Sequence, residues 1–241
     1  MTGHFNLTTL TLVVLSSILA DASRVSADVY SDPSGFSINY PDGWFPLSKA
    51  QQGQIQSELP PALQNAIQGK QIDLSQIAVM IMRNGDEEYL ESLNVVVNDS
   101  QIPVSASRTN ELRNMITQQY SSMGASISSV EASVKTYSSQ DVYVIDYSMT
   151  LPGIELPLRQ RQYMVPGDGK SYIITCSSTE TAFAKHEATF EQMMNSFQAP
   201  APKNSGFDLS RIGGTGLVGV IVGGLIGLLK AFSGRSKNSQ G

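Results

Sequence analysis

The sequence has little of what covalent and metal chemistry use. Among its 241 residues Cys176 is the only cysteine, which excludes an intrachain disulfide and a cysteine cluster for zinc. It has two histidines and one tryptophan, and only 15% of its residues are charged. The sequence also contains no phosphate-binding glycine loop, dinucleotide fingerprint or Gly-x-Ser-x-Gly elbow. We therefore nominate no catalytic residue and no cofactor from the sequence.

Positive charge is also scarce in the body of the chain. Residues 28–210 hold 20 acidic and 11 basic side chains, a net charge of −9. Such a balance disfavours nucleic acid as a partner, because Lys and Arg drive binding by neutralising phosphates. Apolar residues make up 41% of the sequence, which is enough to build the core of a globular domain.

The N-terminal end is typical of a secretory signal peptide. Residues 7–20 carry no charge and have the length of a signal-peptide hydrophobic region, while being too short to span a bilayer. Small residues then offer cleavage sites after Ala27 or after Ala22. We predict a signal peptide over residues 1–27, and the alternative is a buried first helix or strand of the domain.

The C-terminal end predicts a membrane anchor. Residues 199–211 form a linker rich in Pro, Gly and Ser, and the next 18 residues, 212–229, carry no charge. At 1.5 Å per residue they extend roughly 27 Å, so we predict a transmembrane helix over residues 212–232. A glycine-rich amphipathic or disordered tail is the alternative.

Charge around this segment predicts its orientation. The tail, residues 233–241, is short and basic, with Arg235 and Lys237 after Lys230, which is typical of the cytoplasmic side. Together with the signal peptide it predicts a single-pass type I membrane protein whose domain is extracytoplasmic, in a periplasm or a lumen.

Three glycines recur every four residues within the predicted anchor. Gly219, Gly223 and Gly227 would share one helix face, and small residues at this spacing let two helices pack closely. The pattern predicts a homodimer through the transmembrane helix. The alternative is that the glycines only reflect the general composition of membrane helices.

Residues 28–198 read as one domain of strands and helices. Alternating apolar residues predict strands, and apolar residues at helical spacing predict helices. The strands follow one another as hairpin neighbours, so we expect an α+β fold with a largely antiparallel sheet flanked by helices. The predicted strands are 36–40, 77–82, 93–97, 127–137, 142–149 and two within 159–178, and the predicted helices are 55–67, 109–123 and one that ends at 197.

Five pieces of this domain carry a family resemblance by their order and spacing. They are Phe36–Trp44, Leu93–Val97, Arg161–Tyr163, Gly169–Thr175 and the closing helix with Phe190 and Phe197. Over residues 29–198 the sequence resembles the PsbP-like superfamily, which includes DcrB-like proteins. The resemblance implies an α/β/α sandwich that serves as a non-enzymatic binding or assembly module. The C-terminal extension departs from the soluble relatives, and no functional residue of PsbP can be matched here.

One acidic group is a weak candidate for a metal site. Asp86, Glu87, Glu88 and Glu91 form the densest carboxylate cluster and could attract a hard cation such as Ca²⁺. They lack the alternating spacing of a calcium loop, so a solvated first turn of a helix is the favoured interpretation.

Four other residues invite functional interpretations. Trp44 and Phe45 are possible partner contacts, although a Trp at the end of a strand is more often part of the core. His186 lies on an apolar helix stripe, which favours packing over catalysis. Cys176 is expected to be a buried thiol, with an intermolecular disulfide as the alternative.

From these observations we expect a membrane-anchored, extracytoplasmic binding or assembly module that is not an enzyme and has a protein partner. The alternatives are a hydrolase of unrecognised type and a protein that binds a cation or a small ligand. Within the chain, the absence of clustered His, Cys and nucleophile motifs weighs against the hydrolase.

Overall fold

A computed structural model describes residues 27–48, 50–52, 77–85, 91–122, 124–151 and 156–202. The first strands are β1 (Ala27–Ser31), β2 (Ser37–Pro41) and β3 (Trp44–Pro46), followed by β4 (Ile77–Arg83) and β5 (Ser92–Asn98). A 3₁₀ turn, η2 (Ala106–Arg108), leads into helix α4 (Thr109–Ser121). The remaining elements are β6 (Ser126–Tyr137), β7 (Gln140–Thr150), β8 (Leu158–Pro166), β9 (Ser171–Thr179) and helix α5 (Phe183–Ser196). The described part is thus an α+β fold.

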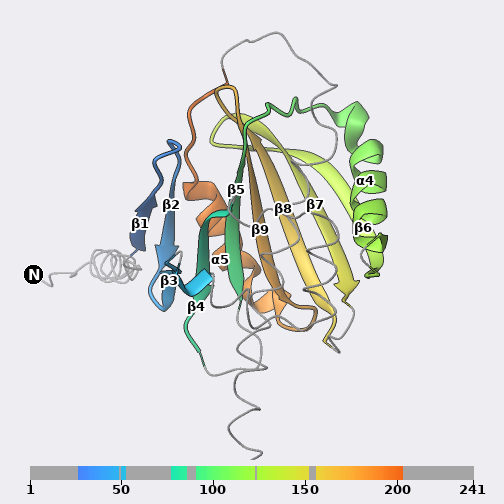
Figure 1. Cartoon of the computed structure of the whole chain (residues 1–241), viewed down its shortest axis with the longest axis horizontal. Helices are drawn as coiled ribbons and strands as arrows, with labels where there is room; N and C mark the ends of the chain where they lie inside the picture. Colours follow the sequence, from blue (N-terminus) through green and yellow to red (C-terminus); the bar gives the residue numbers. More distant parts are fainter. Residues whose placement is uncertain are drawn as a thin grey trace, which may run out of the picture.

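Seven of the strands form one sheet in the order β3-β4-β5-β9-β8-β7-β6 (Figure 1). Every neighbouring pair in it is antiparallel, as the hairpin-rich sequence predicts. β1 and β2 form a separate antiparallel ribbon. The pairing of β5 with β9 joins residues about eighty positions apart, so it closes the two halves of the domain into one sheet.

The two helices cover opposite faces of the sheet. Figure 1 shows α4 in front of the sheet beside β6, while α5 lies behind β4, β5 and β9. Two buried clusters follow from this arrangement, one with Leu112, Ile116 and Tyr120 of α4 and one with Phe183, Phe190 and Met193 of α5. Because side chains alternate along a strand, β4 to β9 each supply residues to both clusters, whereas β1, β2 and β3 contribute only to the cluster under α5.

The face under α4 contains a buried network of neutral hydrogen bonds. The hydroxyl oxygens of Tyr120 and Tyr147 lie 2.6 Å apart, and the Tyr147 hydroxyl donates to Oε1 of Gln160 at 2.5 Å. The Gln160 amide in turn donates to Ser177 Oγ at 3.3 Å. Burial raises the pKa of both tyrosines above the ordinary value, so this layer stays uncharged at neutral pH.

β6 contains a bulge that changes which of its side chains face α4. Ile127 and Val130 both pack on the α4 side although they are three residues apart, which strict alternation would forbid. The register shifts between Ser128 and Glu131, and Ser129 takes a positive φ of 51°. The extra residue returns Glu131 to the α5 side of the sheet.

Most of the predicted strands and helices within the described residues are present in the structure. The strands expected at 36–40, 77–82, 93–97, 127–137 and 142–149, the hairpin after Arg159 and the helices at 109–123 and before 197 are confirmed within a few residues. β1 and β3 were not predicted. The predicted helix at 55–67 falls outside the described residues, as does most of the signal peptide.

The predicted anchor, residues 212–232, and its glycine face, Gly219, Gly223 and Gly227, also lie outside the described residues. Within the described part, neither helix has both the length and the apolar character needed to cross a membrane. The anchor therefore stays a prediction.

Candidate functional site

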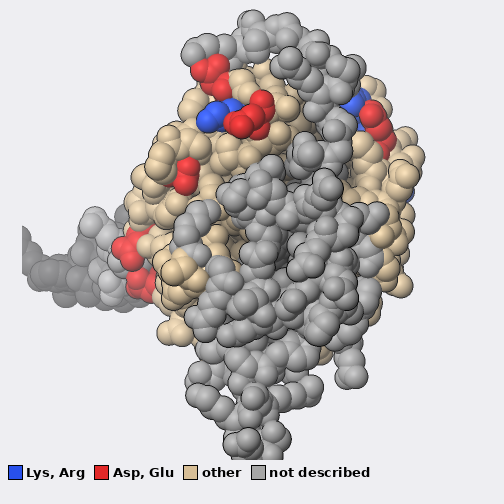
Figure 2. All heavy atoms as spheres, in the orientation of Figure 1, with Lys and Arg blue, Asp and Glu red and all other residues tan. Residues whose placement is uncertain are grey.

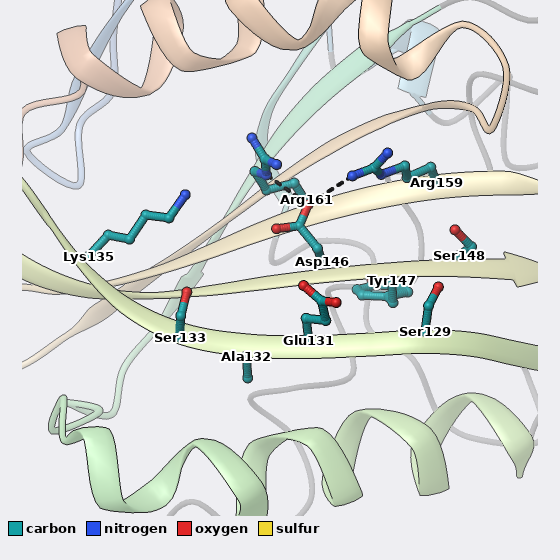
Figure 3. A pocket seen from close by; sticks show the side chains of 10 residues that line it. All are labelled: Ser129, Glu131, Ala132, Ser133, Lys135, Asp146, Tyr147, Ser148, Arg159 and Arg161. Atoms are coloured by element: carbon teal, nitrogen blue, oxygen red, sulfur yellow. Dashed lines mark hydrogen bonds and ion pairs between the residues drawn. The ribbon is translucent and has the colours of Figure 1, made fainter.

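A polar pocket of about 400 Å³ lies on the α5 face of the sheet, over β6, β7 and β8 (Figure 3). Ten residues line it: Ser129, Glu131, Ala132, Ser133 and Lys135 from β6, Asp146, Tyr147 and Ser148 from β7, and Arg159 and Arg161 from β8. The β6 side of this face is exposed to solvent, whereas β9 is almost entirely buried. The pocket thus lies at the edge of the part of the sheet that α5 covers.

Arg161 forms the inner wall of the pocket, and each of its three guanidinium nitrogens contacts a carboxylate. Its Nε donates to Asp146 at 2.8 Å, its Nη1 donates to Glu191 at 2.7 Å, and its Nη2 lies 2.8 Å from Glu187. Only 7% of its side chain is exposed. Burial by itself lowers the pKa of Arg161, but the bonds to Asp146 and Glu187 outweigh it and the net shift is upward.

Two tyrosines complete this ionic cluster under α5. The hydroxyls of Tyr137 and Tyr163 both donate to Glu191, at 2.9 and 3.1 Å. Burial, with the nearby Glu191 carboxylate as a further cause, raises the pKa of both hydroxyls. The cluster links β6, β8 and α5, so its role is to hold the helix on the sheet.

Arg159 lies two residues away on the same face of β8 and has a different environment. Its side chain is 34% exposed, and its guanidinium stands over the Phe183 ring at 4.8 Å from the centroid. Its Nη2 lies 4.0 Å from Asp146 Oδ1, which is too long for a hydrogen bond. Among the described residues Arg159 therefore has a fixed position and unused donors.

Two carboxylates meet at the floor of the pocket. Glu131 and Asp146 are direct cross-strand partners, and Figure 3 shows Glu131 pointing from β6 toward Asp146. Like charges at directly opposite positions destabilise a sheet. Arg161 offsets the charge of Asp146, whereas Glu131 is exposed and forms no ion pair with any residue that the structure describes.

A second polar cluster lies near the start of β5 and combines Glu91, Arg83, Ser178 and His186. Glu91 is only 3% exposed and its Oε2 pairs with Arg83 Nε. Its Oε1 accepts from Ser178 Oγ at 3.3 Å and lies 3.4 Å from His186 Nε2. Serine and histidine both face the carboxylate, which is the geometry of a packed ion cluster and not of a nucleophile activated by a base.

This geometry bears on two predicted residues. His186 packs between α5 and the sheet, as its position on the apolar stripe predicts. Glu91, one of the four metal candidates, is paired with Arg83, which competes with a cation for the carboxylate. Asp86, Glu87 and Glu88 lie outside the described residues, and in the described part no group of three or more His, Cys, Asp or Glu side chains is placed to hold a metal ion.

The two aromatic candidates for partner contact are in different settings. Trp44 is buried at 8% exposure and packs edge-to-face on Phe190, with the ring centroids 5.8 Å apart. Phe45 points the other way and remains 38% exposed. A partner contact at this strand stays a prediction, and the geometry leaves it to Phe45.

Cys176 is fully buried beneath α5. Burial raises the pKa of its thiol well above the ordinary value, so it is a small apolar residue of the core. This setting disfavours the intermolecular disulfide.

Sequence reasoning did not find the pocket. Arg159 and Arg161 stand at the i, i+2 spacing that places two charges on one face of a strand, which is a detectable signal. Glu131 and Asp146 gave no such signal, because their meeting depends on the register of β6 with β7.

Figure 2 shows the charges on the opposite side, where α4 lies. Among the described residues visible there, acidic and basic side chains occur in small separate groups, and they form no continuous basic patch.

Comparisons with known proteins place the chain in a family. The PsbP family model matches residues 26–199. CyanoP, the cyanobacterial PsbP of Synechocystis, is 19% identical, and the alignment covers 74% of this chain and 95% of that protein with a TM-score of 0.47. LpqN of Mycobacterium tuberculosis, which is involved in cell envelope biogenesis, is 9% identical, with 72% and 90% coverage and a TM-score of 0.40.

The Ran-binding protein Mog1p of Saccharomyces cerevisiae is also similar in structure. It is 9% identical, with 73% of this chain and 97% of that protein covered and a TM-score of 0.44. No curated protein sequence is significantly similar to the chain.

Proposed function

The chain belongs to the PsbP family, and from this and from the geometry of the pocket we propose that it is a non-enzymatic binding or assembly module anchored to a membrane. The observation that carries the proposal is the open part of the α5 face. There Arg159, Glu131 and Lys135 are held on a rigid sheet, and their side chains form no hydrogen bond to a described residue. Exposed charges on rigid elements favour specific recognition of a partner.

The ends of the domain support a tether. Gln198 pairs with Ser37 of β2 through two backbone hydrogen bonds of 2.9 Å, and Gly35 lies against Pro200. The chain therefore leaves the domain at a fixed place beside β2. A linker over residues 199–211 and an anchor over 212–232 would hold the pocket close to the membrane, which raises its effective concentration for a partner on the same surface.

The location and oligomeric state belong to the same proposal. A signal peptide and a basic tail of residues 233–241 support a type I orientation with an extracytoplasmic domain. The face formed by Gly219, Gly223 and Gly227 supports a homodimer through the anchor. Digestion of the domain by a protease added to the cytoplasmic side would contradict the orientation.

Crosslinking of the full chain in native membranes, followed by identification of the captured proteins, tests the assembly role. We expect a second membrane-associated protein to be captured, and we expect capture to fall when Arg159 and Glu131 are both neutralised by R159Q and E131Q. If only the protein itself is captured, the assembly role fails. Unchanged capture by the double variant would instead place the contact elsewhere on the domain.

A further inference from the structure

The charges around the pocket do not balance, because carboxylates outnumber basic side chains there by one. The pocket and the Arg161 cluster together contain the carboxylates of Glu131, Asp146, Glu187 and Glu191 against Arg159, Arg161 and Lys135. The excess negative charge is at Glu131, beyond the reach of the bonds that Arg161 makes. A positive group bound between Glu131 and Asp146 would relieve the repulsion of this cross-strand pair.

The bulge in β6 lies at this pocket and determines where Glu131 points. Ser129 holds a φ of 51°, which is strained for a residue other than glycine, and the extra residue aims Glu131 at Asp146. Without the bulge the side chain of Glu131 would face α4. Bulges that re-aim a side chain are common beside functional sites, so backbone strain and the placement of Glu131 point to one purpose.

Arg159 supplies the opposite charge at the other side of the pocket. Asp146 of β7 pairs with Glu131 on one side and with Arg161 on the other, and Arg159 lies two residues further along β8. The backbones of Arg159 and Glu131 are therefore roughly 12 Å apart, and both side chains lie on the α5 face. The guanidinium of Arg159 stacks on the Phe183 ring, and Figure 3 shows this guanidinium directed into the pocket toward Asp146. Its planar fork of donors fits a carboxylate.

A metal ion is a poor fit for this arrangement. Glu131 and Asp146 provide only two carboxylates, and Asp146 Oδ1 already accepts a 2.8 Å bond from Arg161. The guanidinium groups of Arg159 and Arg161 would repel a divalent cation at the same place. An organic ammonium group can instead bind at Glu131, with the rest of the molecule extending across the pocket toward Arg159.

We propose that this pocket binds a small zwitterion, a molecule with an ammonium group and a carboxylate several carbon atoms apart, as in an ω-amino acid. The ammonium group binds between Glu131 and Asp146, the carboxylate binds Arg159, and the hydroxyls of Ser129 and Ser133 complete the polar wall. The volume of about 400 Å³ is within the range of small-molecule pockets. This ligand-binding activity goes beyond the assembly role and does not depend on it.

Three probes of equal length test the proposal on the purified full chain. They are 5-aminopentanoate with both charges, pentylamine with the positive charge alone and pentanoate with the negative charge alone. Calorimetry is expected to show the zwitterion binding at least about tenfold more tightly than either analogue, because each lost charge pair costs about 1.4 kcal/mol. Equal affinity for all three, or no binding of any at about 10 mM, would overturn the proposal.

Variants assign the two charges. E131Q is expected to weaken 5-aminopentanoate about tenfold and leave pentanoate unchanged, while R159Q weakens it about tenfold and leaves pentylamine unchanged. Two exposed residues outside the pocket serve as controls for net charge, with D99N matching the first variant and K185Q the second. If a control variant reduces binding as much as its partner does, the effect is non-specific attraction and the site assignment fails.

Discussion

Two arginines on one face of β8 have opposite environments, although they are only two positions apart in the sequence. Arg161 lies under α5 and bonds to Asp146, Glu187 and Glu191, with 7% of its side chain exposed. Arg159 lies where the cover of the helix ends, and its closest described carboxylate oxygen is 4.0 Å away. Whether α5 covers the arginine, and not the type of residue, thus decides whether its charge holds the fold together or is available to bind a partner.

The comparison predicts its largest effect at the covered arginine. R161A should lower the free energy of unfolding by about 3 kcal/mol, because it leaves three carboxylates at the α5 interface without their cation. Urea unfolding of the purified protein measures this loss. A change below about 0.5 kcal/mol would show that the cluster does not hold the helix to the sheet.

Alkaline pH should weaken the covered region by a smaller amount. Burial, with nearby Glu191, raises the pKa of Tyr163 and Tyr137 above the ordinary value of 10.0, so both stay neutral in the fold when the unfolded chain ionises. Their contribution is therefore fully present below pH 10 and is lost as the pH rises above it, by about 1.4 kcal/mol per pH unit for each tyrosine.

Thermal unfolding between about pH 8 and pH 11 measures this decline. Y163F should make it shallower, because that variant has one fewer group to ionise in the unfolded state. An equally steep decline in Y163F would mean that the buried tyrosines do not cause it.

The open arginine should give the smallest stability effect. R159Q removes one long contact and a partly exposed cation, so the free energy of unfolding should change by less than about 0.5 kcal/mol. The same unfolding experiment, run beside R161A, measures the difference between the two positions. A loss in R159Q as large as that in R161A would remove the distinction between covered and open charges.

The sequence predicted the local elements well because periodicity records which face of an element is buried. Ile145, Tyr147 and Met149 alternate with polar residues and form β7, and Leu112, Ile116 and Tyr120 repeat at helical spacing and form α4. β1 was missed because four of its five residues are exposed and carry no such record. Tertiary pairing with β2 makes it a strand.

The pocket could not be predicted in the same way. Glu131, Asp146 and Arg159 come from three strands, and they meet only through the pairing registers and the bulge at Ser129. A shift of one residue in either register would turn these side chains to the other face. Single-sequence patterns contain the alternation along each strand but not the alignment between strands.

A site-specific photo-crosslinker gives the most direct test of the claim that the open part of the α5 face is the binding surface. One version of the full chain carries it in place of Ser133 in the pocket, and the other carries it in place of Gln118, which is exposed on α4 across the sheet. In native membranes we predict a crosslinked partner from the Ser133 position and none from Gln118. Equal capture from both positions, or capture from Gln118 alone, would contradict the account.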